Sequence, residues 1–173
     1  HAVTNMNSLF LNCASLKSVD GSMFNTVNVT DMGSLFSGCS SLRSVDLSGF
    51  NTAQVRNMSA MFSSCRSLQA IDVSKFDTSK VTSMGSMFLA CSSLTSLDVS
   101  KFDMTNVKNN SDMLEACYSL KTVKVGEKGD WAGSFPDDIY VGQHGGFSGV
   151  AETWRWADKA TGAKYRSDEI PAQ

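Results

Sequence analysis

The sequence of 173 residues is poor in the residues and motifs on which catalysis and metal binding depend. It has only two histidines, His1 and His144, and no CxxC motif or Cys/His cluster that would indicate a zinc site. It also lacks a G-x-S-x-G motif, a phosphate-binding glycine loop and a recognisable pair of catalytic acids. We therefore predict that the protein is not an enzyme and uses neither a cofactor nor a metal ion.

Charge and hydrophobicity argue against two further classes of partner. The 15 basic and 17 acidic residues give a net charge of -2, which is not basic enough to indicate binding to nucleic acid. No apolar run approaches the roughly 20 residues that a membrane-spanning helix needs. We expect no direct membrane span within this stretch of chain.

What the sequence does contain is a repeat of 26 residues. The five cysteines recur at this interval, at Cys13, Cys39, Cys65, Cys91 and Cys117. Other apolar positions keep the same phase. Three residues before each cysteine stand Phe10, Phe36, Phe62, Phe88 and Leu114, and three residues after it stand Leu16, Leu42, Leu68, Leu94 and Leu120. A fixed period of this length is typical of a solenoid, in which each repeat stacks on the next.

Within one repeat the apolar spacing changes from helical to strand-like. Met84, Met87, Phe88 and Cys91 are spaced as on one face of a short helix, and the residue before them is a good helix N-cap in every repeat (Asn5, Asp31, Asn57, Ser83 and Asn109). After the cysteine, the alternation of Leu97 and Val99 predicts a strand of the leucine-rich repeat type. We therefore predict an α/β solenoid, a leucine-rich repeat fold with short parallel strands on one face and short helices on the other.

The cysteines are expected to be free and buried. Each lies on the predicted inward face of a helix, and a free cysteine behaves as a small hydrophobic residue. An odd number of equally spaced cysteines leaves one unpaired in any disulfide scheme. A disulfide bridge between adjacent coils is the alternative.

If Leu97 and Val99 point inward, the polar residues between them form an exposed strand face. We predict that this face binds a partner through Arg43, Ser44, Asp46, Ser48, Gln69, Asp72, Ser74, Lys75, Thr95, Ser96, Asp98, Ser100 and Lys101. Repeat surfaces of this kind usually bind proteins, although a polar sheet face can also simply meet water. A cation bound along the column of aspartates is disfavoured, because no calcium-type loop accompanies it.

The string VTSMGSMFLACSSLTSLDVSKFD resembles the repeat of BspA-like leucine-rich repeat surface proteins of bacteria, from Val3 to about Val125. The resemblance implies a secreted protein, anchored to the cell envelope, that mediates adhesion to host proteins or to neighbouring cells. It therefore implies a bacterial, extracellular surface module whose anchor lies in other parts of a longer chain. Consistent with this, HAVTNMNSLF enters in the middle of a repeat, so we expect the chain to be a piece of a longer protein.

We divide the chain into a repeat array, residues 1–125, and a C-terminal cap or linker, residues 126–173. The second region holds all three tryptophans, and the alternation in ETWRWADKATGAKYR predicts a β-hairpin. Solenoid ends need a cap, so Trp154 and Trp156 are expected to cover the last coil. Two alternatives remain open: these tryptophans stack on a sugar ring and bind a glycan, or the repeats serve only as a spacer that displays another domain.

Overall fold

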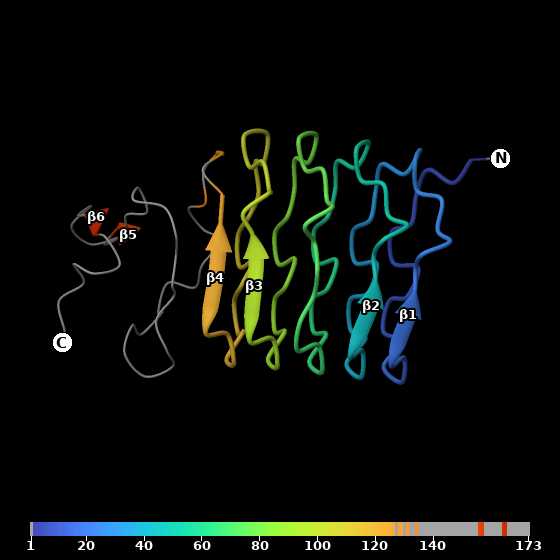
Figure 1. The fold of residues 1–173 in the computed structure, drawn as a ribbon, viewed down its shortest axis with the longest axis horizontal. Helices are drawn as coiled ribbons and strands as arrows, with labels where there is room; N and C mark the ends of the chain where they lie inside the picture. Colours follow the sequence, from blue (N-terminus) through green and yellow to red (C-terminus); the bar gives the residue numbers. More distant parts are fainter. Residues whose placement is uncertain are drawn as a thin grey trace.

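The structure is a computed structural model that describes residues 2–126, 128, 129, 131 and 134, and the backbone of residues 156–157 and 164–165. Successive coils of the chain stack along one axis (Figure 1). We number the coils from their recurring valines, so that coil 1 begins at Val3, coil 2 at Val29, coil 3 at Val55, coil 4 at Val81 and coil 5 at Val107. The predicted repeat fold is thereby confirmed.

The strands pair in parallel with a register of one repeat. β1 (Ser18–Asp20) in coil 1 pairs with β2 (Ser44–Asp46) in coil 2. β3 (Ser96–Val99) in coil 4 pairs with β4 (Thr122–Val125) in coil 5. Partners are equivalent positions, such as Val19 with Val45 and Leu97 with Val123, so the strand prediction is correct in these four coils.

Coil 3 interrupts the sheet, which differs from the single continuous sheet that the repeat predicts. Residues 70–74 form no strand, although Val73 remains buried. Thr95 N–H still donates to Gln69 O at 3.2 Å, but no backbone hydrogen bond joins residues 70–74 to either neighbouring coil. Because the ladder of hydrogen bonds is not formed at this coil, the four strands of the repeat array form two separate pairs, β1 with β2 and β3 with β4.

The predicted helices are wrong, because no residue that the structure describes is helical. The segment from Met84 to Cys91 is instead a run of tight turns, in which Met87 N–H donates to Met84 O and Cys91 N–H to Phe88 O, each at 3.1 Å. The third residue of each of these turns has a positive φ, 57° at Ser86 and 57° at Ala90. Other coils repeat this conformation, at Ser8, Asn12, Ser34, Gly38, Ala60, Ser64, Asp112 and Ala116.

Hydrogen bonds between coils explain why turns replace a helix. The N–H groups of Met84, Ser86, Phe88 and Ala90 donate to carbonyls of coil 5, at 2.7 to 3.0 Å. These N–H groups are therefore not available for the i→i−4 bonds of a helix. We call residues 5–12 and their equivalents the turn row. The backbone hydrogen bonds that join one turn row to the next all run in one direction, from an N–H of one coil to a carbonyl of the coil that follows. In coil 1 the donors are the N–H groups of Met6, Ser8, Phe10 and Asn12.

The residues predicted as helix N-caps do accept a nearby backbone bond, but they cap a turn. Asn5 Oδ1, Asp31 Oδ1, Asn57 Oδ1 and Asn109 Oδ1 each accept the N–H two residues later, at 2.7 to 3.2 Å. Together with Ser83 they form a column of parallel bridges from coil to coil. The preference of Asn and Asp for such local bonds accounts for their recurrence here.

The inward face was predicted correctly even though its backbone is not helical. Met84, Met87, Phe88 and Cys91 are fully buried. The rings of Phe10, Phe36, Phe62 and Phe88 stack along the axis, with centroids 5.3, 5.5 and 5.6 Å apart and planes within 15°. Aromatic pairs at this separation attract one another beyond the benefit of burial, so the ladder stabilises the stacking of coils.

The prediction that the cysteines form no disulfide bond is confirmed, and the prediction that they are buried is confirmed for three of the five. All five thiols are free, and Cys39, Cys65 and Cys91 are fully buried, but Cys13 is exposed and Cys117 half-buried. Cys13 is exposed because coil 1 has no coil on its outer side among the residues described. Burial raises the pKa of Cys65 to about 12 and that of Cys117 to about 11.

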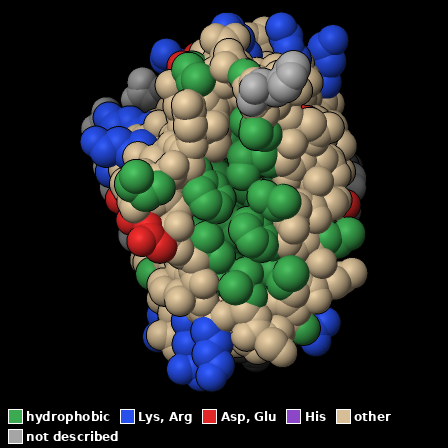
Figure 2. All heavy atoms as spheres, turned by 90° about the vertical axis from the view of Figure 1, so that its right-hand side faces the viewer, with side chains coloured by type: hydrophobic (Ala, Val, Ile, Leu, Met, Phe, Trp, Pro, Cys, Tyr) green, Lys and Arg blue, Asp and Glu red, His purple; other side chains and the backbone are tan. Residues whose placement is uncertain are grey.

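The outer end of coil 1 is apolar. Figure 2 shows hydrophobic side chains gathered in the middle of this end of the stack. The large apolar residues of coil 1 that remain exposed are Val3, Leu9, Leu11, Met23 and Val27, of which Met23 is 90% exposed. This end is the cross-section of the core that the following coils bury.

The opposite end of the array is covered by residues that follow β4. Trp131 is buried, and its Nε1–H donates to Gly126 O at 3.1 Å. Leu114 N–H donates to Ser134 O and Met104 N–H to Lys128 O. Further on, β5 (Trp156–Ala157) and β6 (Lys164–Tyr165) pair antiparallel, as expected for the predicted hairpin. The expectation that Trp154 and Trp156 cover the last coil concerns side chains outside the described residues.

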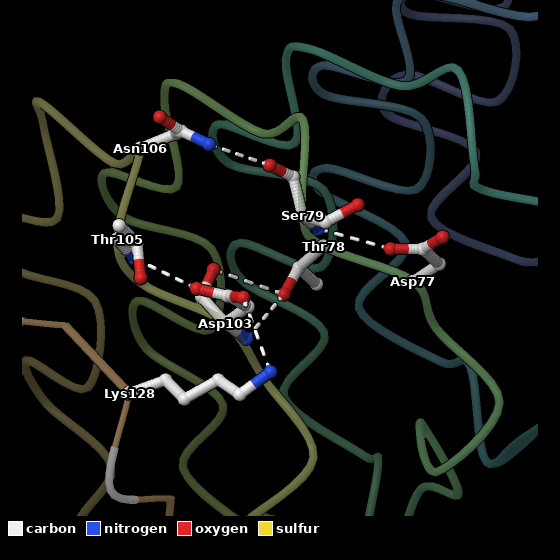
Figure 3. Close-up of polar contacts among 7 residues, drawn as sticks. All are labelled: Asp77, Thr78, Ser79, Asp103, Thr105, Asn106 and Lys128. Atoms are coloured by element: carbon white, nitrogen blue, oxygen red, sulfur yellow. Dashed lines mark hydrogen bonds and ion pairs between the residues drawn. The ribbon is translucent and has the colours of Figure 1, made fainter.

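A column of buried threonines joins the coils on a third side. Thr78 Oγ1 accepts the N–H of Asp103 at 2.6 Å and donates to Asp103 O at 3.2 Å (Figure 3). Thr26 and Thr52 make the same pair of bonds to Asn51 and Asp77. Each hydroxyl thus serves the next coil as both acceptor and donor, much as a strand residue would.

Candidate protein-interaction face

The structure places the predicted partner-binding residues on the exposed side of the strands. Twelve of the thirteen are exposed and Ser100 is half-buried, whereas Leu47, Val73, Leu97 and Val99 between them are buried. The strand face is therefore polar and open to solvent. It consists of Arg43, Ser44, Asp46, Ser48, Gln69, Asp72, Ser74, Lys75, Thr95, Ser96, Asp98, Ser100 and Lys101.

The aspartates of this face have a structural task that the sequence does not reveal. The Oδ1 atoms of Asp46, Asp72 and Asp98 each accept a backbone N–H two residues later, at 2.8 to 2.9 Å. Each carboxylate thereby fixes the turn that follows the strand segment. Replacing one of them by lysine would damage the turn as well as change the charge.

These local bonds also stabilise the charged form of the carboxylates. Hydrogen bonds from the side chain and the backbone of Ser74 hold the pKa of Asp72 below its usual value. The pKa of Asp98 is lowered in the same way, first by Ser100 and then by Lys124, whose Nζ lies 3.1 Å from Asp98 Oδ2. Asp72 and Asp98 are therefore ionised at neutral pH. The aspartate column holds no cluster of three His, Cys, Asp or Glu groups suited to a metal ion, nor does any other part of the described chain.

A shallow hollow of about 480 Å³ lies on this face, beside Arg43 and Gln69. Its lining combines two predicted residues, Arg43 and Gln69, with two that the sequence reading missed, Ser67 and Ser93. Arg43 comes from coil 2, Ser67 and Gln69 from coil 3, and Ser93 from coil 4. Serines occur throughout the repeat, so nothing in the sequence distinguishes Ser67 and Ser93 from the serines that line no hollow.

The predicted glycan-binding pair is not brought together by any described contact. Trp154 lies outside the described residues, and Trp156 is described only as a backbone position of β5. Its backbone pairs with that of Tyr165.

In the part of the chain that the structure describes, no helix is long and apolar enough to cross a bilayer.

Comparison with solved structures supports the repeat fold. A leucine-rich repeat protein of T. pallidum shares 24% sequence identity with this chain and superposes with a TM-score of 0.50. The match covers 71% of this chain and 52% of that protein, so the chain spans about half the length of the relative it matches. At this identity the likeness establishes the fold and nothing about function. No curated protein matches the sequence.

A family model gives the relationship at the level of sequence. It is described as DUF285, a Mycoplasma protein of unknown function, and it matches residues 1–71 and 46–125. The two matches overlap and together extend over the repeats of coils 1 to 5. Since they cover more than half of its residues, the chain belongs to the DUF285 family.

Proposed function

We propose that the chain is a non-enzymatic module that binds a protein partner through its strand face, centred on the hollow beside Arg43 and Gln69. The observation that carries the proposal is this hollow, which lies on an exposed and polar face. Such a depression can receive a projecting side chain of a partner. Extended solenoid surfaces commonly serve in protein binding.

The setting that we propose is the bacterial cell surface. The repeat resembles those of BspA-like proteins, which implies a secreted, envelope-anchored protein and adhesion to an extracellular or host protein, or to neighbouring cells. The small polar residues of the face suit a contact that is weak per module and is strengthened when many copies are displayed together.

Charge reversal at the hollow tests the proposal. The variant Arg43→Glu/Gln69→Glu should lose binding to extracellular-matrix proteins in a surface-based screen, by about tenfold or more if the hollow receives a central anchor residue. Both side chains are exposed, and neither makes a side-chain hydrogen bond within the described chain, so folding should be unaffected. Arg66→Glu is the control, because Arg66 is an equally exposed cation that lines neither this hollow nor the second one described below.

Three results would oppose the proposal. Equal binding by the double variant and the wild-type protein would show that the hollow is not the site. Binding confined to a glycan array and lost in Trp154→Ala/Trp156→Ala would favour glycan recognition in its place. Absence of binding in both screens would favour a spacer.

A further inference from the structure

A second hollow, of about 300 Å³, carries a concentration of positive charge. It is lined by Arg56, Ser79, Lys80, Thr82, Asn106 and Lys108. Three of these six residues are cations and none is an acid, although the whole chain has a net charge of -2. This basic hollow is distinct from the strand face, with which it shares no lining residue.

The backbone holds the three cations in a fixed triangle. Arg56 N–H donates to Thr30 O, Thr82 N–H to Arg56 O, and Lys108 N–H to Thr82 O, each at 2.8 Å. Coils joined in this way lie about 4.8 Å apart, so Arg56 and Lys108 stand about 10 Å apart on either side of Thr82. Lys80 stands two residues before Thr82, as the third residue of the turn that the Val81 N–H closes on Thr78 O at 2.9 Å.

The three cations are all exposed at the surface. Val55, which precedes Arg56, and Val81, which follows Lys80, are fully buried, whereas Arg56, Lys80 and Lys108 are exposed. Lys80 Nζ donates to Gln54 Oε1 at 2.9 Å, which holds the ammonium group at the surface. Asn106 Nδ2 donates to Ser79 O at 2.7 Å and ties coil 4 to coil 3 beside the hollow (Figure 3).

The nearby carboxylates accept backbone hydrogen bonds within their own turns, although Asp77 is also close enough to Lys80 for that ammonium group to help lower its pKa, after the hydrogen bonds of Ser79. Asp77 Oδ1 accepts the N–H of Ser79, and Asp103 Oδ1 accepts that of Thr105, each at 3.0 Å (Figure 3). Asp103 Oδ2 also lies 3.5 Å from Lys128 Nζ. Arg56 and Lys108 make no ion pair within the described chain. Their charge is therefore available to a ligand.

We propose that the basic hollow binds a sulfate ester group of a sulfated polysaccharide. Three cations around one concave surface suit a tetrahedral oxyanion, whose oxygens can accept charge-assisted hydrogen bonds from several donors at once. The hydroxyl groups of Ser79 and Thr82 add neutral donors to the same lining. A polysaccharide carries many such groups, so repeated weak contacts add up along its length.

The test is titration of the full chain with a heparin oligosaccharide at low ionic strength. The variant Arg56→Gln/Lys80→Gln/Lys108→Gln should bind at least about tenfold more weakly than the wild-type protein, since each lost cation removes a charge-assisted contact. The matched control is Lys17→Gln/Arg66→Gln/Lys121→Gln, which removes the same charge from exposed positions outside both hollows. It should retain binding within about threefold.

Inorganic sulfate and inorganic phosphate are titrated in parallel to identify the source of the oxyanion. Weak binding of both ions, together with tighter binding of heparin, would support a polymeric ligand. Tight binding of free phosphate with none of heparin would overturn the polysaccharide as the source. An equal loss in the two triple variants would show attraction to overall charge, and no heparin binding by the wild-type protein would refute the site. The strand-face partner should bind all these variants alike, so this proposal can fail without the failure of the proposed function.

Discussion

Replacing Thr78 by valine should destabilise the protein far more than its small change in shape suggests. Thr78 is 1% exposed, and its hydroxyl is both acceptor for the N–H and donor to the carbonyl of Asp103. Valine keeps the volume and leaves both groups of Asp103 without this partner. A buried polar group left unsatisfied costs about 1 to 3 kcal/mol. Both bonds of Asp103 are only part-buried, so the two together should cost about 2 to 4 kcal/mol, in the lower part of the summed range.

Serine at the same position separates the hydrogen bonds from the packing. Thr78→Ser retains the hydroxyl and removes one buried methyl group, which should cost about 1 kcal/mol. A second control is Thr30→Val, because Thr30 Oγ1 makes a longer bond, 3.3 Å to Thr4 O, at an exposed position. Its loss should change the free energy of unfolding by less than about 0.5 kcal/mol.

Urea denaturation followed by circular dichroism measures these differences at constant m-value. The expected order of stability is wild type and Thr30→Val, then Thr78→Ser, then Thr78→Val. A valine variant as stable as the serine variant would refute the reasoning, because it would mean that the threonine column stabilises the stack only by its bulk.

Three further predictions concern the core, the thiols and the acid range. Phe62→Ala should cost about 3 to 5 kcal/mol in the same assay, because Phe62 is fully buried between two stacked rings; an unchanged melting temperature would contradict this. Thiol titration of the native protein should find Cys13 reactive, Cys117 slow and the other three unreactive until the chain unfolds; prompt labelling of all five would show that the ladder is open. The free energy of unfolding should fall as the pH drops below about 4, because protonation opposes folding wherever folding lowers a carboxyl pKa, as at Asp20, Asp72, Asp77, Asp98 and Asp103. Asp72→Asn keeps the acceptor of the turn and should make stability less dependent on pH. The same pH profile in the variant and the wild-type protein would argue against this role of Asp72.

The burial pattern could be predicted from the sequence because it depends only on which positions recur as apolar. Met84, Met87, Phe88 and Cys91 point inward whether the backbone is a helix or a run of turns. The same spacing therefore led to correct core residues and to a wrong element. An isolated helix of eight residues is unstable in water, so bonds to the neighbouring coil decide the backbone, and these bonds are not visible in a local pattern.

Two other features carried only faint signals. Gly38 occupies one of the positive-φ positions, but its equivalents Asn12, Ser64, Ala90 and Ala116 give no glycine pattern. The threonine column recurs as Phe-Asn/Asp-Thr, yet a polar residue in a turn motif is ordinarily read as exposed. For the candidate site, polarity and exposure were predictable residue by residue. The hollow was not, because it depends on how side chains of three successive coils lie beside one another, from Arg43 to Ser93.

The one-way donation along the turn row gives the stack a polarity of assembly. The carbonyls of Asn5, Asn7, Leu9 and Leu11 correspond to those that coil 2 offers to coil 1, and no described residue donates to them. The apolar end shown in Figure 2 therefore has acceptors along one of its edges, the turn row. Two copies that place one turn row against the other bring carbonyl against carbonyl, so that arrangement is opposed despite the exposed apolar side chains. Along the turn row, the ladder can be extended only by an edge that presents N–H groups, which is the edge that each coil presents to the coil that follows it.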